Sequence, residues 1–535
     1  MGREKTAFAH GPPLARWLRV NRLLLGTVVA GLAAAWSSTA RADTTEHIEG
    51  DVPTDGPEHF WVPFEVPAGT AEIEVAHTDN SDTNILDWGV YDETGAFRGY
   101  GGGNTEDAII GVAASSRSYL IGPIHPGTWK IDVGKAKILS FPEHYTIDVT
   151  FRTAPTLAPQ TERTPYTPRP AIKTGARWYA GDFHTHSKES GDAKPEIADM
   201  ITFAKSLGLD FLELSDHNTV SQLDFYAANQ DPDVLLVPGV EFTTYHGHGN
   251  GIGATQWVDH KIGLDGATID GAIAAFHAQG AFFSINHPAM NIGDLCIGCA
   301  WEWQVDPSTI DGVEIETGGY KEAGTLFHNP AMEMWETILS SGKHAFALGG
   351  SDDHQGGQGT GYQYSPMASP TTMVYATELS VAGLMEGLRE GRTVVKLQSP
   401  ADPMIDFDID GRSGSDTLVA KHSRLHATVT GGLGAVFHFV KDGVELADED
   451  VTTDPFEATL DVDAPASGED RYRAEVWVDD RPATITSHVF LKTGDASFDE
   501  GGCSTAPQRS EGGAWGTCLF ALGALFARAR RRLRW

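Results

Sequence analysis

Cysteine is scarce in this chain, with four residues in 535. Cys503 and Cys518 lie near the C-terminus, and Cys296 and Cys299 form one isolated C-x-x-C pair. A pair without a second pair excludes a four-cysteine zinc site, and so few cysteines exclude a disulfide-stapled scaffold. A local disulfide between Cys296 and Cys299 is the favoured interpretation. Reduced structural thiols and a redox pair are the alternatives.

Basic residues are also few: 39 Lys and Arg stand against 73 Asp and Glu, for a formal net charge of −34. Both ends of the chain are basic, so the part between them is more acidic still. Nucleic-acid binding relies on Lys and Arg that neutralise phosphates. We therefore expect no nucleic-acid partner. A small-molecule ester held by metal ions remains compatible with this charge.

Long apolar runs are missing as well. The two terminal runs, 23–35 and 514–527, are shorter than the roughly 20 residues that span a bilayer. Arg16, Arg19 and Arg22 precede the first run, and Ala-Arg-Ala at 40–42 follows it. This pattern predicts an export signal over 1–42, with an uncleaved anchor helix as the alternative.

The C-terminal segment 495–535 combines Gly502 and Cys503 with the second apolar run and an arginine cluster at 528–534. It resembles the myxobacterial type of C-terminal sorting tag, which implies processing near Cys503 and attachment to the cell surface. A weak tail anchor is the alternative. Both interpretations place the chain outside the cytoplasm, in the periplasm or on the cell surface in association with the outer membrane. Oligomeric state is not readable from the sequence.

Glycine and proline, in contrast, are plentiful, with 60 and 28 residues. A chain of this length is expected to fold as several domains. Period-two alternation with frequent turns predicts an N-terminal β-sandwich over 43–153, in which nothing indicates catalysis, and a second β-sandwich over 400–494. Five prolines between 154 and 174 predict an extended linker.

Strands alternate with helices over 175–399. Apolar strands are expected at 211–214, 234–240, 281–285 and 344–348, and helical faces are marked by Ile197 to Ala204, Ile269 to Phe276 and Met332 to Leu339. Functional side chains that follow strands at their carboxyl ends are typical of a βα-barrel with its site on one face.

The residues after these strands are His, Asp and Glu. They occur as D-F-H-T-H at 182–186, S-D-H-N at 215–218, G-V-E at 239–241, G-H at 247–248, N-H-P at 286–288 and S-D-D-H at 351–354. Imidazole and carboxylate ligands without cysteine suit Zn, Mn or Fe used in hydrolysis. A lone His-x-His pair would be weak evidence, but the repeated placement predicts a metal-dependent hydrolase with two or three divalent ions.

This ordered set resembles the PHP (polymerase and histidinol phosphatase) superfamily. The run from Pro238 to Gly253 is similar to its exported branch typified by carbaryl hydrolases (CehA/McbA-like). The resemblance covers about residues 175–400. It implies a distorted, TIM-like barrel of seven β/α units, a (β/α)7 fold, flanked by the two β-sandwiches and holding up to three metals.

Carried over to this chain, the resemblance implies a first metal bound by His184, His186, Glu241 and Asp352. Glu241 would bridge to a second metal held by His248 and His287. His217 and His354 would hold a third, where several relatives have a further His and this chain has Asp192. An oxygen ligand at that position weakens zinc relative to Mn or Mg. His246 is a possible substitute for His248.

Two further aspartates precede ligands in these motifs. We expect Asp182 and Asp216 to orient the imidazoles by accepting their N–H bonds, with a purely structural role as the alternative. Metal ions bridged by Glu241 are expected to lower the pKa of a shared water toward about 7 and so supply hydroxide.

The sequence therefore predicts an exported phosphoesterase for small phosphate esters. Two alternatives remain open: a carbamate or carboxylic ester hydrolase, and a surface-bound binding protein with an inert central domain. The loops at 187–195, 288–304 and 355–370 are expected to shape the substrate pocket.

Overall fold

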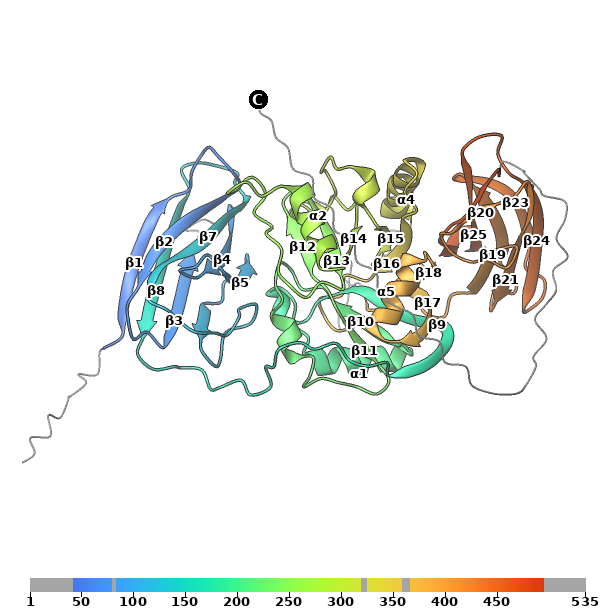
Figure 1. The fold of residues 1–535 in the computed structure, drawn as a ribbon. Helices are drawn as coiled ribbons and strands as arrows, with labels where there is room; N and C mark the ends of the chain where they lie inside the picture. Colours follow the sequence, from blue (N-terminus) through green and yellow to red (C-terminus); the bar gives the residue numbers. More distant parts are fainter. Residues whose placement is uncertain (1–41, 79–82, 319–324, 358–365, 495–535) are drawn as a thin grey trace, which may run out of the picture.

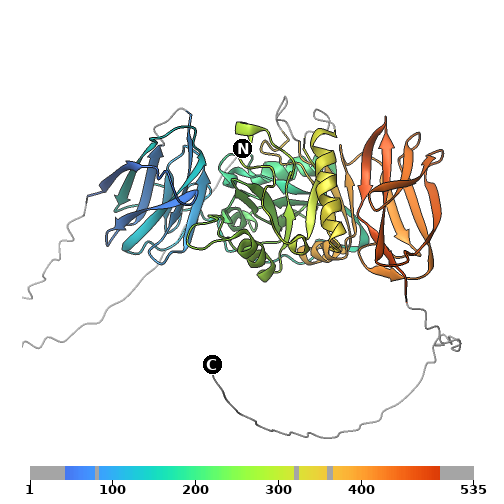
Figure 2. The same ribbon diagram turned by 90° about the horizontal axis from the view of Figure 1, so that it is seen from above.

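A computed structural model describes residues 42–78, 83–318, 325–357 and 366–494. They form three bodies in a row: an N-terminal sandwich, a central region and a C-terminal sandwich (Figures 1 and 2). Within these residues, no helix is long and apolar enough to cross a membrane. The predicted export signal and C-terminal tag lie outside the described residues.

The N-terminal sandwich consists of two four-stranded sheets. One has the order β1 (Thr44–Asp51), β8 (His144–Arg152), β3 (Glu72–Thr78), β6 (Ala108–Gly111), and the other β2 (His59–Val66), β7 (Gly127–Lys137), β4 (Ile85–Tyr91), β5 (Phe97–Gly102). Trp129, Ile131 and Val133 alternate along β7 and are completely buried between the sheets. Their period of two is the reason this segment forms a strand with one core face.

The proline-rich segment after β8 lies against both neighbouring bodies. Its buried Arg163 donates to the carbonyl of Tyr119 in the sandwich (2.9 Å) and pairs with Asp224 of the central region (3.4 Å). Thr164 also donates its backbone N–H to the carbonyl of Asp224. The segment therefore ties the sandwich to the central region.

The central region contains two sheets, and each includes parallel strands. The first runs β11-β10-β9-β17-β18 and the second β12-β13-β14-β15-β16. The bounds are β9 (Lys173–Thr185), β10 (Phe211–Leu214), β11 (Leu235–Pro238), β12 (Glu241–Thr244), β13 (Gly247–Ile252), β14 (Phe282–Ile285), β15 (Gly312–Thr317), β16 (Phe346–Gly350), β17 (Thr371–Leu379) and β18 (Thr393–Lys396).

Four α-helices accompany these strands among the described residues: α1 (Ile197–Leu207), α2 (Ile269–Ala278), α4 (Thr325–Ser340) and α5 (Val381–Arg389). Short 3-10 helices are η1 (Lys188–Ser190), η2 (Ser221–Phe225), η3 (Gly293–Leu295) and η4 (Pro307–Thr309). Helix α1 buries Ile197, Met200 and Ala204 on one face and ends at Gly208, whose φ of 76° is left-handed. Glycine adopts this conformation without a steric penalty.

The C-terminal sandwich shares a sheet with the central region. Its strands are β19 (Met404–Ile409), β20 (Thr417–Val419), β21 (His422–Thr430), β22 (Val436–Lys441), β23 (Val444–Asp450), β24 (Phe456–Asp463), β25 (Glu469–Val478), β26 (Arg481–Thr486) and β27 (Val489–Lys492). Antiparallel pairing of β18 with β26 extends the first central sheet through β25 and β22 to β23. The three-stranded sheet β19-β21-β24 covers the other side of that core.

The expected strands at 211–214, 234–240, 281–285 and 344–348 are confirmed within one or two residues, and the three expected helical faces lie on α1, α2 and α4. The chain is multidomain and rich in β-sheet. The strand pairing does not show a closed ring of seven strand–helix units. The described strands of the central region form two sheets, accompanied by four α-helices. The physical reason is the β12–β13 hairpin: it reverses the chain direction within the second sheet and needs no crossover helix.

Candidate metal centre

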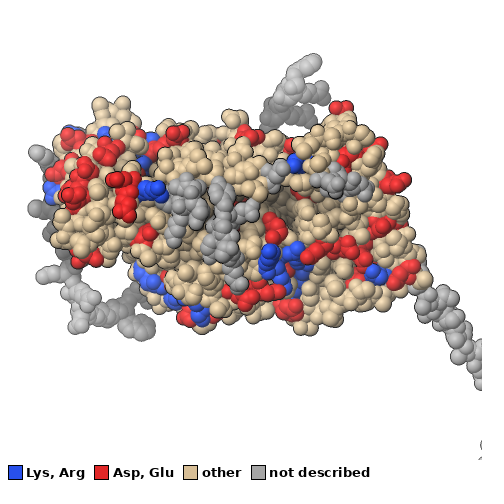
Figure 3. Space-filling model, turned by 180° about the vertical axis from the view of Figure 1, so that it is seen from behind, with Lys and Arg blue, Asp and Glu red and all other residues tan. Residues whose placement is uncertain are grey.

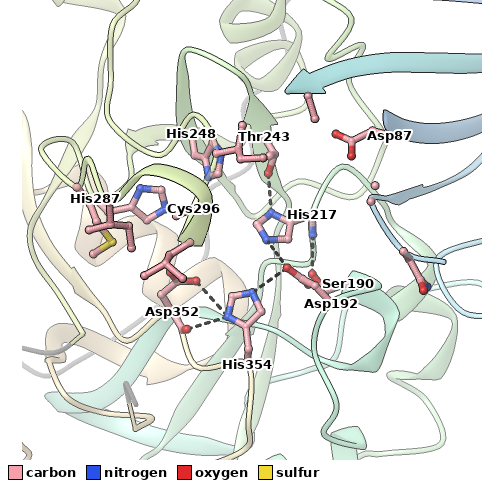
Figure 4. A pocket seen from close by; sticks show the side chains of 18 of the residues that line it. Asp87, Ser190, Asp192, His217, Thr243, His248, His287, Cys296, Asp352 and His354 are labelled. Atoms are coloured by element: carbon pink, nitrogen blue, oxygen red, sulfur yellow. Dashed lines mark hydrogen bonds and ion pairs between the residues drawn. The ribbon is translucent and has the colours of Figure 1, made fainter. Parts of the chain in front are cut away.

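His, Asp and Glu side chains from the central strands and the loops between them gather in one cluster. Figure 4 shows part of it, with His217, His248, His287, Asp352, His354 and Asp192 labelled. His184 lies near the end of β9, and His186 follows that strand. His217 follows β10, His287 follows β14, and Asp352 and His354 follow β16. Glu241 begins β12, and His248 lies in β13. Parallel bridges join Thr185 to Asp353 and His217 to Glu241. These bridges bring the two sheets together at the cluster.

Four of these residues form the tightest group. Nε2 of His184 lies 3.2 Å from Oε1 of Glu241 and 3.3 Å from Oδ1 of Asp352. Nε2 of His186 lies 3.5 Å from Oε2 of Glu241 and 3.1 Å from Oδ1 of Asp352. His184, His186, Glu241 and Asp352 together offer ligand atoms within 4.8 Å of one another. They are the residues expected to bind the first metal.

The carboxylate of Glu241 also faces three further imidazoles. Its Oε1 lies 3.0 Å from Nε2 of His287 and 3.4 Å from Nδ1 of His248, and its Oε2 lies 2.8 Å from Nδ1 of His217. Glu241 is therefore at the middle of the cluster, as a bridging ligand would be.

Asp192 connects the other two imidazoles. Its Oδ2 lies 3.4 Å from Nε2 of His217 and 3.3 Å from Nε2 of His354. Ligand atoms of His186, His217 and His354 also fall within 4.8 Å of one another. All nine residues predicted as metal ligands thus lie in one cluster. Asp192 lies beside His217 and His354, the two residues expected to hold the third ion.

Buried atoms without hydrogen-bond partners test whether metal ions fit here. Among the described residues, Nε2 of His184 and His186, Oε2 of Glu241, Oδ1 of Asp352 and both ring nitrogens of His248 are buried and have no such partner. Buried polar atoms are nearly always satisfied in folded proteins. Lone pairs of nitrogen and oxygen that face one another at these distances fit divalent cations.

Charge within the cluster shifts its pKa values. Burial acts to raise the pKa of Glu241, but His184 and His217 outweigh it and hold that pKa well below its usual range. Burial acts to lower the pKa of His354, but Asp192 and Asp352 raise it to about 9. Carboxylates are thus held ionised, which is the form that binds metals.

Glu314, on β15, is a member of the site that the sequence analysis missed. Its Oε1 lies 2.7 Å from Nδ1 of His184, and its Oε2 accepts the backbone N–H of His287 at 2.8 Å. The available signal was a charged residue inside the completely buried strand Gly312–Thr317. Other imidazoles are oriented by Ser190 Oγ at His186, Thr243 Oγ1 at His217 and the carbonyl of Cys299 at His287.

Asp182 and Asp216 do not make the expected imidazole contacts. Asp182 accepts backbone N–H groups from His184, Ser351 and Ala368. Asp216 accepts from the backbone N–H and the hydroxyl of Ser187. Burial raises the pKa of Asp182 to about 6 and that of Asp216 to about 8. Both aspartates therefore fix the loops that carry the ligands, because backbone amides satisfy a buried carboxylate without using a ring nitrogen.

Two of the ligand residues have a left-handed backbone conformation. His287 and Asp352 have φ values of 27° and 58°, which non-glycine residues adopt at a cost of about 1–3 kcal/mol. Gly350 precedes the second turn, where a Cβ would meet both Glu314 and the Cβ of His184. The absence of a side chain at Gly350 is what allows Glu314 to approach His184.

A cavity of about 760 Å³ opens in front of the cluster. Asp87, Tyr100 and Asn104 of the N-terminal sandwich form one wall, a role that no sequence motif in that domain indicates. The loops at 187–195 and 288–304 contribute as expected, through Asp192, Met290, Ile292, Leu295 and Ile297. Of the third loop, 358–365 lies outside the described residues. No Lys or Arg is among the described residues that line the cavity.

The structure also places His246 and the Cys296–Cys299 pair, for which the sequence left alternatives open. His246 lies outside the cluster, 3.0 Å from both Glu58 and Glu302. Cys296 and Cys299 are joined in a disulfide beside the cavity, as favoured from the sequence.

Comparison with known proteins gives no match to a family model and no match to a curated protein. Among solved structures, the chain is similar to a two-domain protein from Bacteroides vulgatus described as containing a predicted PHP-like metal-dependent phosphoesterase. The identity is 18%, over 61% of this chain and 98% of that one, with a TM-score of 0.33. A CARDB domain from Pyrococcus furiosus, solved with two metal ions, matches 18% of this chain and 99% of its own at 14% identity and a TM-score of 0.13. At TM-scores this low, neither likeness settles the fold or the activity of this chain.

Proposed function

We propose that this chain is a metal-dependent hydrolase of the PHP type, acting on small phosphate esters. The observation that carries the proposal is the buried cluster of nine ligand residues around Glu241, which faces the cavity with unsatisfied nitrogen and oxygen atoms. The ordered motifs from Asp182 to His354 support the PHP assignment and, with it, the carbaryl-hydrolase-like branch.

The residues present define what the site does with metal bound. Divalent ions held by the His, Asp and Glu ligands supply Lewis acidity and lower the pKa of water toward about 7. Glu241 lies between the two groups of imidazoles and would contribute negative charge to ions held on either side of it. Glu314 holds His184 in place through Nδ1 and leaves Nε2 directed into the cluster.

Hydrolysis of a carbamate or carboxylic ester is the second candidate, because of the cavity lining. Met290, Ile292, Leu295, Ile297 and Phe327 offer apolar surface, and the lining that the structure describes has no Lys or Arg to pair with a phosphate dianion. Apolar walls suit an uncharged ester with an aromatic leaving group. A phosphate ester would depend on the metals alone for charge compensation.

A substrate panel separates these candidates. The full chain, loaded in turn with Zn, Mn and Fe, is assayed on nitrophenyl phosphate, bis-nitrophenyl phosphate and naphthyl methylcarbamate. Preference for either phosphate by kcat/KM supports phosphoesterase activity, and preference for the carbamate supports the second candidate. Failure on all three with every metal, in a folded protein, favours the inert binding protein.

We further propose that the chain is exported and attached to the cell surface, without nucleic-acid partners. On the face that Figure 3 shows, acidic side chains outnumber Lys and Arg on both outer domains, as expected for a surface that stays solvated and repels phosphate backbones. Mass spectrometry of the native protein tests the export: a product ending near residues 43 and 503 supports it, and an intact chain in the cytosol contradicts it.

A further inference from the structure

A second cluster of metal-binding side chains lies where the N-terminal sandwich meets the central region. His59 is on β2, Asp132 is on the neighbouring strand β7, and His260 lies in the segment between β13 and α2. One ligand atom from each falls within 4.8 Å of the others. The three residues are 4%, 0% and 1% exposed. The cluster is therefore closed to solvent and draws on two domains.

Hydrogen bonds account for only part of this cluster. Nδ1 of His59 and Oδ1 of Asp132 are 3.1 Å apart and bonded. Both ring nitrogens of His260 and Oδ2 of Asp132 are buried and have no hydrogen-bond partner within the part of the chain that the structure describes. Nε2 of His260 lies 3.8 Å from that oxygen, too far for a hydrogen bond. A neutral imidazole carries one N–H and one lone pair, so complete burial without a partner needs an explanation.

Aromatic side chains pack against both imidazoles, and no described residue supplies a hydrogen bond to the ring of His260. The ring of Tyr100 lies 4.4 Å from that of His260, edge to face, and the ring of Tyr245 stacks on His59 at 5.3 Å. The neighbouring Lys261 is compensated by Asp259 at 2.6 Å and by the hydroxyl of Tyr91 at 2.8 Å. Its charge therefore does not supply the missing partner for Asp132.

We propose that His59, Asp132 and His260 bind one divalent transition-metal ion, in a structural site separate from the candidate catalytic centre. Two imidazoles and one carboxylate are a ligand set that suits zinc. A cation between them pairs with the lone pair of His260 and with Oδ2 of Asp132, the atoms that hydrogen bonding leaves unsatisfied.

The location gives this ion a consequence for the cavity. Two of its ligands belong to the sandwich and one to the central region, so the ion crosslinks the domains. Tyr100 and Tyr245, which contact the ligand rings, also donate to Oδ2 of Asp87 on the cavity wall, at 2.9 and 2.8 Å. The site thus fixes the wall that the sandwich contributes.

Anomalous diffraction at the zinc edge tests the proposal on the full chain, crystallised with zinc. We expect a peak about 2.0–2.2 Å from the ligand atoms of His59, Asp132 and His260, in addition to peaks at Glu241. Peaks at Glu241 with none at the junction would overturn this inference and leave the proposed function standing. A peak at the junction alone would support it and count against the catalytic centre.

Metal content of variants gives a second reading that does not depend on activity. His260→Gln should contain one equivalent of zinc less than the parent chain. His277→Gln is the matched control, because His277 is half-buried and bonds only Asp311 among the described residues. Equal zinc in His260→Gln and the parent would overturn the proposal. If His260→Gln does not fold, Asp132→Asn is measured in the same way, and the diffraction result on the parent decides.

Discussion

At the scale of the residue, the position of Glu241 separates it from the other ligands. Its two oxygens face His184, His287 and His248 on one side and His186 and His217 on the other. Among the described imidazoles, Asp192 faces His217 and His354, and its side chain is half exposed. A carboxylate shared by two cations matters more than one at the edge of the cluster.

Glu241→Gln should therefore cost far more activity than Asp192→Asn. We expect a loss on the order of a thousandfold or more for Glu241→Gln, since removal of one charge weakens both cations, and a much smaller loss for Asp192→Asn. Steady-state kinetics of both variants at saturating metal measure the difference. Equal and mild losses would contradict the bridging position of Glu241.

Glu314 provides a second prediction at this scale, as a positioning residue. Glu314→Gln weakens the contact with Nδ1 of His184 and should lower metal affinity about 10–100-fold, the range found for partners that orient a metal-bound imidazole. Competition with a chromophoric chelator measures the affinity. Glu316→Gln is the matched control, because Glu316 lies on the same strand and pairs with His328. Comparable affinity for both variants would remove the positioning role.

The sequence contained the ligands but not the contacts that orient them. Most of the ligands lie in short motifs at the ends of apolar strands, so those motifs are local and readable. Glu314, Ser190 and Thr243 are recognised only by what they touch, and those contacts depend on how the strands are placed side by side. For the same reason, the sequence motifs of Asp182 and Asp216 do not distinguish a carboxylate that orients an imidazole from one that accepts backbone N–H groups, as these two do.

At the scale of the element, single strands and helices were predictable and their assembly was not. Apolar periodicity and glycine caps fix β10, β14, α1 and α2 to within about two residues. Three features stay hidden because they depend on pairing between distant segments: the antiparallel β12–β13 hairpin, the pairing of β17 with β9, and the pairing of β18 with β26.

Strand β3 provides a pH prediction at this scale. His77 stacks on Trp88 of β4 with ring centroids 4.4 Å apart, and burial lowers its pKa from 6.5 to about 4. Between these values the unfolded chain binds a proton that the folded strand does not. The contribution of His77 to the free energy of unfolding is therefore fully present above pH 6.5. It falls by at most about 3 kcal/mol as the pH drops from 6.5 to 4.

Hydrogen exchange of peptides from β3 and β4 between pH 6.5 and 4 measures this loss locally. After correction for intrinsic exchange rates, the His77→Phe variant should keep more protection from exchange at low pH than the parent, because the Phe ring does not take up a proton. His125→Phe, at an exposed position of the same sandwich, serves as the control. Identical pH dependence in the parent and His77→Phe would contradict the prediction.

At the scale of the whole molecule, the N-terminal sandwich contributes part of the cavity wall. Asp87 and Tyr100 line it, and Asp87 accepts hydrogen bonds from Tyr100 within the sandwich and from Tyr245 in the central region. The sequence indicated only a β-sandwich without catalytic motifs, because a wall needs no motif. Its position is set by contacts between domains.

Asp87→Ala should loosen this wall. We expect KM for a bulky ester to rise about tenfold, the equivalent of roughly one net hydrogen bond, with little change in kcat. Asp107→Ala, at an exposed position of the same sandwich, should leave both constants unchanged. A fall in kcat with unchanged KM for small and bulky esters alike would contradict a role in substrate binding.

Metal content of the purified full chain tests the central claim most directly. The buried ligand atoms around Glu241 predict at least two equivalents of divalent transition metal by mass spectrometry. A chelator should remove these ions together with hydrolytic activity, and added metal should restore both. A well-folded chain that contains no metal, and takes up none on reconstitution, would contradict the account.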